Sequence, residues 1–271
     1  MLNAGPQNNY DSKMKSLLLG IYFIFALLPF VSVNAAVDDE VAVESNVIYS
    51  TPYKQRRSTH GILFGVSSEK FYPKEMLSLL DDASIDQILD KKPIDLLNIS
   101  LGYKYNFNLG ALSLVYSFSE GSGSGRFNNA QRKIHFQKQN ISVGYYADNV
   151  LSEPWVVPYG QAGLNQFSMT EEESNAAGEQ LFEDSQTTDF SLMYSVGLLF
   201  QLNWIEGGID ANTHADGLRS SGLENTFLDI YFSWHQPAQK LYDPNNRAAT
   251  LEDDPNLSAE AQLGVGLKLE F

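Results

Sequence analysis

The stretch that decides the fold is "LGVGLKLEF", residues 263–271, in which apolar and non-apolar residues alternate strictly. One side carries the apolar residues Leu263, Val265, Leu267, Leu269 and Phe271. The other side carries two glycines, Lys268 and Glu270. Because successive side chains of a strand point to opposite faces, the pattern predicts a β-strand with one apolar face. It fits either an edge strand of a soluble sandwich or a strand with lipid outside and a polar lumen inside.

The same alternation recurs along the chain. The further segments are 61–67, 97–107, 111–118, 133–147, 155–167, 190–202 and 228–234. Eight segments of about ten residues each are what tilted, membrane-spanning strands require. Their non-apolar faces are rich in Gly, Ser, Asn and Gln, which suits the narrow interior of an eight-stranded barrel. A soluble sandwich would carry abundant Lys and Glu on that face.

The connections between these segments differ in length. Long connections are predicted at 70–95, 119–132, 169–187 and 238–259, and short turns at 108–110 and 148–154. Long loops on one side and short turns on the other are typical of outer-membrane barrels. Residues 204–224 break this pattern, because a short periplasmic turn is expected there and the connection is about twenty residues long. We interpret it as either a small periplasmic flap or a segment that conceals an extra strand. The apolar spacing within 70–95 predicts one or two short helices over the barrel rim.

The N-terminus carries a targeting signal. Lys15 is followed by an apolar core over 17–31 and by small residues, the three-part pattern of a secretory signal peptide. Cleavage is expected after Ala35, with Ala36 as second choice, and residues 1–13 are interpreted as an extension upstream of Met14. The alternative is a retained transmembrane anchor.

Three regions are therefore predicted: 1–35 as extension and signal peptide, 36–57 as a periplasmic leader and 58–271 as the barrel. The balance of 33 Asp and Glu against 18 Lys and Arg argues against nucleic acid as a partner. The sequence has no cysteine, which excludes disulfides, thiolate nucleophiles and Cys-based metal sites. After residue 36 no apolar run approaches the ~20 residues of a spanning helix, so any membrane crossing must use strands.

Taken together, these features resemble the eight-stranded outer-membrane β-barrel proteins of Gram-negative bacteria, in the OmpA-like, OmpX-like and OmpW-like group. The resemblance implies an all-β, antiparallel, up-and-down transmembrane barrel over 58–271, located in the cell outer membrane. It implies a monomer surrounded by outer-membrane lipid. It also implies that Phe271, on an alternating last strand, is recognised by the barrel-assembly machinery. Function does not follow from the fold, which hosts adhesins, tethers, channels and lipid-modifying enzymes.

Four charged residues fall on the predicted lumen face: Lys104, Asp229, Lys268 and Glu270. All are expected in the periplasmic half of the lumen. Because buried charges are tolerated only when they are paired, we expect an internal ion-pair cluster that plugs the barrel. The alternative is a narrow ion path.

The histidines are the candidates for catalysis: His60, His135, His214 and His235. Lipid A-modifying barrels use a His with a Ser and a carboxylate, and a catalytic triad needs these groups within hydrogen-bond reach. The sequence offers no such set, so all four are predicted to be rim or loop histidines and the chain is predicted not to be an enzyme.

No cofactor or metal site is predicted. The run 121–125, "GSGSG", is expected to be a flexible loop tip and not a phosphate-binding loop. The acidic clusters 171–173 and 252–254 lack the ligand spacing of a calcium loop and are expected to be solvated carboxylates.

The favoured function is a structural or surface-interaction role through the loops 70–95, 169–187 and 238–259. A narrow pore for ions or a small hydrophobic solute is one alternative, and a lipid A-modifying enzyme is another.

Overall fold

A computed structural model describes residues 53, 57–72, 77–80, 83–128, 130–175, 177–202, 222–236 and 259–271. Several predictions fall elsewhere in the chain. The signal peptide with its cleavage at Ala35, most of the leader, most of 204–224 with His214, and nearly all of 238–259 lie outside the described residues.

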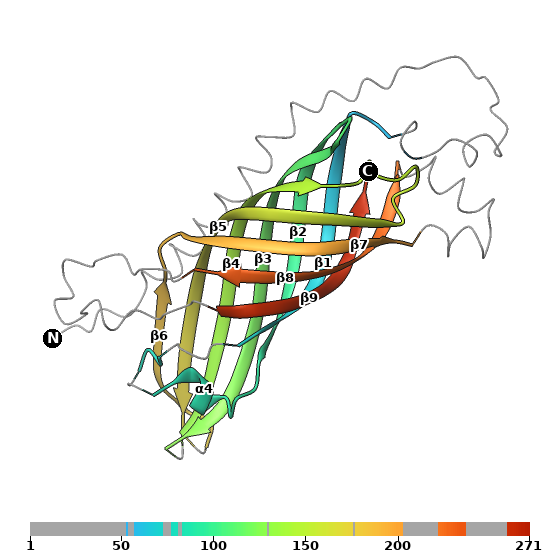
Figure 1. The fold of residues 1–271 in the computed structure, drawn as a ribbon. Helices are drawn as coiled ribbons and strands as arrows, with labels where there is room; N and C mark the ends of the chain where they lie inside the picture. The colour runs from blue at the N-terminus through green and yellow to red at the C-terminus, as the bar shows by residue number, and fades with distance from the viewer. Residues whose placement is uncertain are drawn as a thin grey trace. The chain divides into compact units, whose positions relative to one another are not determined.

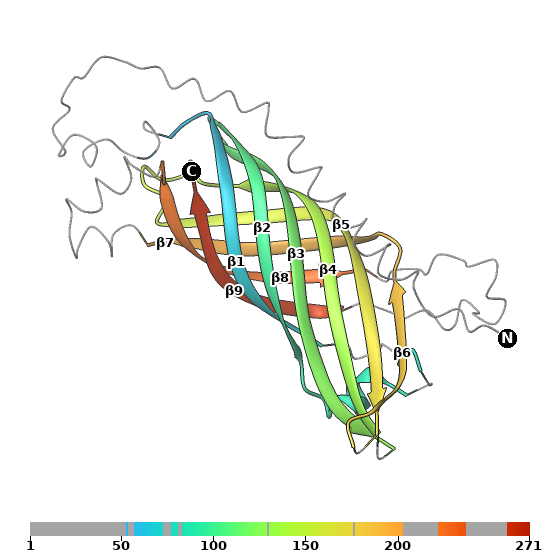
Figure 2. The same ribbon diagram turned by 180° about the vertical axis from the view of Figure 1, so that it is seen from behind.

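The described residues form one antiparallel sheet that closes on itself (Figures 1 and 2). The strands are β1 (His60–Phe71), β2 (Ile94–Phe107), β3 (Gly110–Phe127), β4 (Ala130–Tyr146), β5 (Val156–Ser174), β6 (Gln180–Thr187), β7 (Ser191–Gln201), β8 (Asn225–His235) and β9 (Ala259–Glu270). Pairing of β1 with β9 and of β4 with β5 completes the circle. All strands except β6 belong to the barrel, which confirms the predicted all-β, eight-stranded, antiparallel fold.

The inside and outside of the barrel follow the alternation. On β9, Lys268 and Glu270 point inward and are buried, whereas Leu267 is half exposed on the outside. Exposed apolar side chains surround the barrel: Leu97, Ile99, Leu101, Leu112, Leu114, Val143, Leu164, Val196, Leu198, Phe232, Leu263, Val265 and Leu267. A band of this kind is the surface that a transmembrane barrel presents to lipid. No helix in the described part of the chain has the length and apolarity needed to cross a membrane.

Two predicted loops are in fact strands. The connection 119–132 is a hairpin, because β3 continues to Phe127 and β4 begins at Ala130. Asn128 lies in this turn at φ 49°, a left-handed conformation that Asn tolerates. The predicted loop 169–187 is also a hairpin, in which β6 pairs with the far end of β5. In Figure 1 these strands project beyond the rest of the barrel as a sheet extension.

One or two short helices were predicted in 70–95, and the described part of this segment contains one helical turn, α4 (Ile85–Ile88). It packs against the inner face of the sheet extension. Glycines on β3 allow this approach, since a Cβ at Gly125 would lie 1.7 Å from the Ile88 carbonyl oxygen and one at Gly123 would lie 2.9 Å from Leu89. The "GSGSG" run is therefore a strand that receives α4, and the predicted flexible loop tip is wrong.

Candidate functional site

The candidate site is the lumen, which all the barrel strands line with polar side chains. At the periplasmic mouth, where β1 begins and β9 ends, Lys104 of β2 forms ion pairs with Glu270 of β9 and with Asp148 after β4. The Lys104 Nζ to Asp148 Oδ2 distance is 2.8 Å. All three side chains are buried. The mouth thus holds two carboxylates around one ammonium group.

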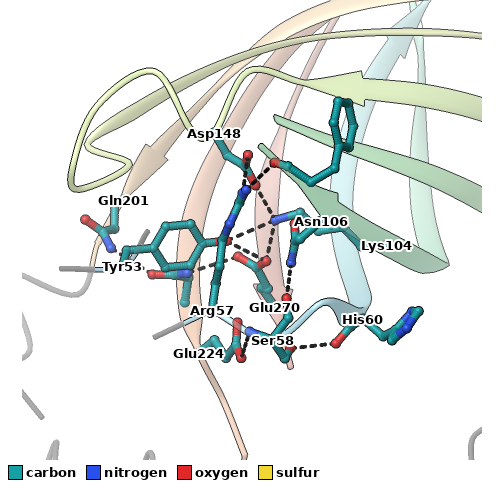
Figure 3. Close-up of polar contacts among 12 residues, drawn as sticks. Tyr53, Arg57, Ser58, His60, Lys104, Asn106, Asp148, Gln201, Glu224 and Glu270 are labelled. Carbon is teal, nitrogen blue, oxygen red and sulfur yellow. Dashed lines mark hydrogen bonds and ion pairs between the residues drawn. The ribbon is translucent and has the colours of Figure 1, made fainter. Parts of the chain in front are cut away.

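The leader contributes side chains to this cluster (Figure 3). Arg57 Nη1 lies 2.8 Å from Asp148 Oδ1. The Tyr53 hydroxyl donates a 2.8 Å hydrogen bond to Glu270 Oε1, and the Tyr53 backbone N–H donates to Glu153 at 2.8 Å. Tyr53 is 1% exposed. Burial, together with the nearby charges of Glu270 and Asp148, raises the pKa of Tyr53, so its hydroxyl remains a donor.

Further side chains hold Glu270 from the neighbouring strands. Asn225 Nδ2 of β8 donates to Glu270 Oε2 at 3.0 Å, and Gln201 Nε2 of β7 donates to Asn225 Oδ1 at 2.7 Å. Both Glu270 oxygens therefore accept hydrogen bonds, which is the condition under which a buried carboxylate is tolerated.

The second pair of predicted lumen charges lies farther along β9. Lys268 Nζ is 2.8 Å from Asp229 Oδ2 of β8, and the Tyr159 hydroxyl donates to Asp229 Oδ1 at 2.8 Å. The Lys268 ammonium also lies 4.6 Å from the centre of the Tyr159 ring. The structure thus brings the four predicted residues together as two ion pairs and not as one cluster.

Sequence reasoning missed two further groups of buried charges. Lys138 of β4 lies 2.8 Å from Glu69 of β1 across the lumen. Nearer the extracellular end, Arg132 lies 2.8 Å from Glu171 and 2.6 Å from Glu173. The sequence contained the information to predict these charges. The two-residue alternation of β1 continues from Ser67 to Glu69, and that of β4 runs back from Asn140 to Lys138 and Arg132, so all three charges fall on the inner face.

The acidic cluster 171–173 was expected to be solvated, and this is wrong for Glu171. Its side chain is fully buried and accepts hydrogen bonds from the Ser78 hydroxyl at 2.8 and 2.9 Å and from the Leu79 backbone at 2.8 Å. Glu171 thereby fastens the β1–β2 connection to β5. Among the described residues, no group of three or more His, Asp or Glu is placed to hold a metal ion.

The histidines divide into two environments. His60 is exposed at the mouth beside Tyr103, and His135 points outward on β4 with Nε2 3.3 Å from Glu120 Oε1. His235 corrects the prediction, because it is buried in the lumen with its ring 5.3 Å from that of Phe167. The alternation over β8 already places His235 on the inner face with Asp229, and the prediction of a rim position did not follow it.

The extracellular end of the lumen is closed by apolar side chains. This outer apolar cluster consists of Phe71, Ala83, Ile85, Ile88, Leu89, Ile94, Leu96, Ile134, Phe136, Phe167 and Met169. Phe71 stacks on Phe136 with ring centres 4.7 Å apart. Between this cluster and the mouth lies a polar cavity, lined among others by Ser67, Asn98, Asn140 and Ser233.

No protein-family model and no curated protein matches the sequence. Several solved structures are similar in fold. The outer membrane protein OprG of Pseudomonas aeruginosa is 9% identical with a TM-score of 0.42, over 79% of this chain and 97% of OprG. Ail, the attachment invasion locus protein of Yersinia pestis, is 15% identical with a TM-score of 0.39, over 79% of this chain and 100% of Ail. The N-terminal β-barrel domain of Pseudomonas aeruginosa OprF is 12% identical with a TM-score of 0.38, over 79% of this chain and 98% of that domain.

The closed ring of eight antiparallel strands, with polar side chains inside and an apolar band outside, is the architecture of outer-membrane barrels. This chain has that fold and spans the outer membrane.

Proposed function

We propose that this protein is a monomeric, non-catalytic outer-membrane barrel that acts through its extracellular surface and does not conduct solutes. The observation that carries the proposal is the closure of the periplasmic mouth by Tyr53 and Arg57. Tyr53 contacts Glu270 and Glu153, and Arg57 pairs with Asp148 and also donates to the Phe107 carbonyl. These bonds join the leader to β2, β9 and the turn after β4.

The sheet extension supports a role at the cell surface. It consists of the extracellular ends of β3, β4 and β5 together with β6. Phe182 of β6 is 63% exposed and Leu181 is 49% exposed, beside the acidic residues Glu183 and Asp184. Exposed apolar side chains on a projecting sheet support a role of this surface in protein contact.

Single-channel recording in planar lipid bilayers tests the closed lumen. The wild-type barrel is expected to show no conductance steps, because the mouth and the outer apolar cluster close the two ends. The matched variant Tyr53→Ala/Arg57→Ala removes the two leader side chains from the mouth, and it is also expected to show no conductance steps, because the outer apolar cluster still closes the other end. Regular conductance steps from the wild-type barrel would contradict the proposal.

A narrow pore is the second candidate, and the polar cavity between the two ends favours it. In this case the wild type would conduct, and the current would fall when cavity-lining residues such as Ser67 or Ser233 are replaced by larger side chains. For the third candidate, a lipid A-modifying enzyme, mass spectrometry of lipid A with and without the protein gives the answer, and no change is expected.

Assembly by the barrel machinery through Phe271 is also a proposal. The Phe271 backbone pairs with Ile62, with N–H to oxygen bonds of 2.8 and 2.9 Å in the two directions. Phe271→Ala keeps this backbone pairing and is expected to slow barrel assembly in cells, while refolding of the purified chain in detergent is unchanged. Equal assembly rates in cells would contradict this role.

A further inference from the structure

A band of buried polar side chains crosses the lumen just below the outer apolar cluster. Its members are Asn140 of β4, Asn165 of β5, Ser233 and His235 of β8, and Gln262 of β9, which we call the polar band. Each is at least nine-tenths buried. Register makes them neighbours, because Asn140 is paired with Asn165 and Ser233 is paired with Gln262. On β7, between them, Ser191 donates to Asn165 Oδ1 at 3.1 Å.

The polar band is unusual in its hydrogen bonding. Seven of its atoms are buried without a hydrogen-bond partner among the described residues: Asn140 Oδ1, Asn165 Nδ2, Ser233 Oγ, His235 Nδ1, His235 Nε2, Gln262 Oε1 and Gln262 Nε2. Folded proteins pair the great majority of buried polar side-chain atoms, and those that lack a protein partner commonly bond to internal water. Seven such atoms in one layer of the barrel indicate a guest that bonds to several of them.

The chemistry of the band restricts the guest. Asn165 Nδ2 and Gln262 Nε2 are donors, Asn140 Oδ1 and Gln262 Oε1 are acceptors, and Ser233 can act as either. The guest must therefore both donate and accept. The nearest charges already neutralise one another, because Glu69 Oε1 is paired with Lys138 at 2.8 Å, and His235 Nε2 lies 3.8 Å from the same oxygen. Neither a cation nor an anion would find an unpaired opposite charge, so the guest is neutral.

The polar band borders a cavity that could hold such a guest. The polar cavity reaches the band at Asn140 and Ser233. We propose that the polar band is an internal binding site for small, neutral, hydroxyl-bearing guests, of which water is the smallest. The guest bridges β4, β5, β8 and β9, and it completes the hydrogen bonding between the Glu69–Lys138 pair and the outer apolar cluster.

The test is nuclear magnetic resonance of the refolded, isotopically labelled barrel in detergent micelles. The side-chain amide protons of Asn165 and Gln262 are expected to show cross-relaxation with long-lived internal water. Asn225 is the matched control within the same lumen, because it does not line the polar cavity and its amide donates to Glu270 at 3.0 Å and accepts from Gln201 at 2.7 Å. Repeating the measurement with ethylene glycol separates the two sources of the hydroxyl group: water alone, or a larger solute. Absence of both signals at Asn165 and Gln262 would overturn the proposal.

A variant provides a second measurement. Gln262→Met removes two of the unpartnered atoms while keeping a side chain of similar length. If a guest bonds there, the melting temperature is expected to fall, because the remaining band loses that bridge. If the band is empty, the melting temperature should rise, because two unsatisfied atoms are gone, and this result would also overturn the proposal. Gln137→Met, on the outer face of β4, controls for the substitution itself.

Discussion

At the periplasmic mouth the lumen is closed by charged side chains, whereas at the extracellular end it is closed by the outer apolar cluster. The mouth depends on a few directed bonds, in which Lys104, Asp148, Arg57 and Glu270 each have defined partners. The outer cluster depends on many non-directional contacts among eleven side chains. Each cluster is buried, but they respond differently to the loss of one residue.

The difference follows from the physics of burial. Removing one partner from a buried ion pair leaves the other charge uncompensated, so the loss is large and concentrated in one residue. Removing an apolar side chain costs transfer free energy and leaves a cavity, and the loss depends on how far the neighbours relax. The stability of a polar plug therefore depends on the identity of each residue, whereas the stability of an apolar plug depends on how well its side chains fit together.

The largest effect is expected at Lys104. Lys104→Met leaves Glu270 and Asp148 buried without their shared ammonium group, and the free energy of unfolding should fall by about 3–5 kcal/mol. Urea unfolding of the refolded barrel, followed by heat-modifiable gel migration, measures the change. Lys92→Met is the control, because Lys92 is exposed and lies 3.9 Å from exposed Asp90, a pair expected to contribute about 0–1 kcal/mol. Equal losses for the two variants would contradict a charged plug.

Lys268 extends the test to the next layer of the lumen. Lys268→Met should cost roughly 3 kcal/mol, at the lower end for a broken buried pair, because Lys268 pairs with one carboxylate, Asp229, whereas Lys104 pairs with two. Lys268→Met/Asp229→Leu removes both charges and should recover part of that loss. Thermal stability and single-channel conductance should be measured together. Unchanged stability with altered conductance in the single variant would show that this pair lines a path and does not plug the barrel.

At the extracellular end, the sensitive feature is shape. Gly125→Ala places a Cβ 1.7 Å from the Ile88 carbonyl oxygen, so α4 must move away from β3. Overpacking of this kind costs about 1–3 kcal/mol. Limited proteolysis should cut the β1–β2 connection faster in the variant while the barrel stays folded. Ser124→Ala, on the outer face of the same strand, should leave the cleavage rate unchanged, and equal rates for both variants would mean that α4 does not depend on this glycine.

The contrast also explains which features the sequence could predict. Strand number, the inner face of each strand and the inward position of the four predicted lumen charges follow from a two-residue alternation, which is local and visible wherever apolar residues mark one face. The alternation becomes invisible in 121–125, where glycine replaces every inward side chain and serine every outward one. The hairpin of β3 and β4 was therefore predicted as a loop. The glycines are there because α4 occupies the space, which is a tertiary requirement.

The partners of the lumen charges could not be predicted in the same way. Glu69 and Lys138 lie on strands that are not neighbours in the sheet, so their contact depends on how the closed barrel brings β1 and β4 across the lumen. The entry of Tyr53 into the mouth had no periodic signal, because the leader sequence shows no two-residue alternation of apolar and polar residues. The hydrogen bond of Tyr53 to Glu270 can be recognised only in the closed barrel, where the leader and the end of β9 meet at the mouth.

The smallest effect is expected at Glu224, at the edge of the mouth. Burial, and then the charge of Glu270, raise the pKa of Glu224 above its usual value. The folded protein therefore binds this proton more tightly than the unfolded chain, and ionisation of Glu224 lowers stability as the pH rises from the unfolded pKa through the folded one. Glu224→Gln removes this penalty, so the variant should gain stability relative to the wild type as the pH rises from about 4 to 7.

Urea unfolding midpoints of both proteins across that pH range measure the difference. The gain should be small, because Glu224 is partly solvated and also accepts a 3.3 Å hydrogen bond from the Ser58 backbone. A variant that loses stability with rising pH relative to the wild type would mean that Glu224 is stabilised as a carboxylate. Glu224 would then belong to the charged plug. The raised pKa instead indicates that Glu224 lies at the edge of the plug, where its negative charge is repelled by that of Glu270.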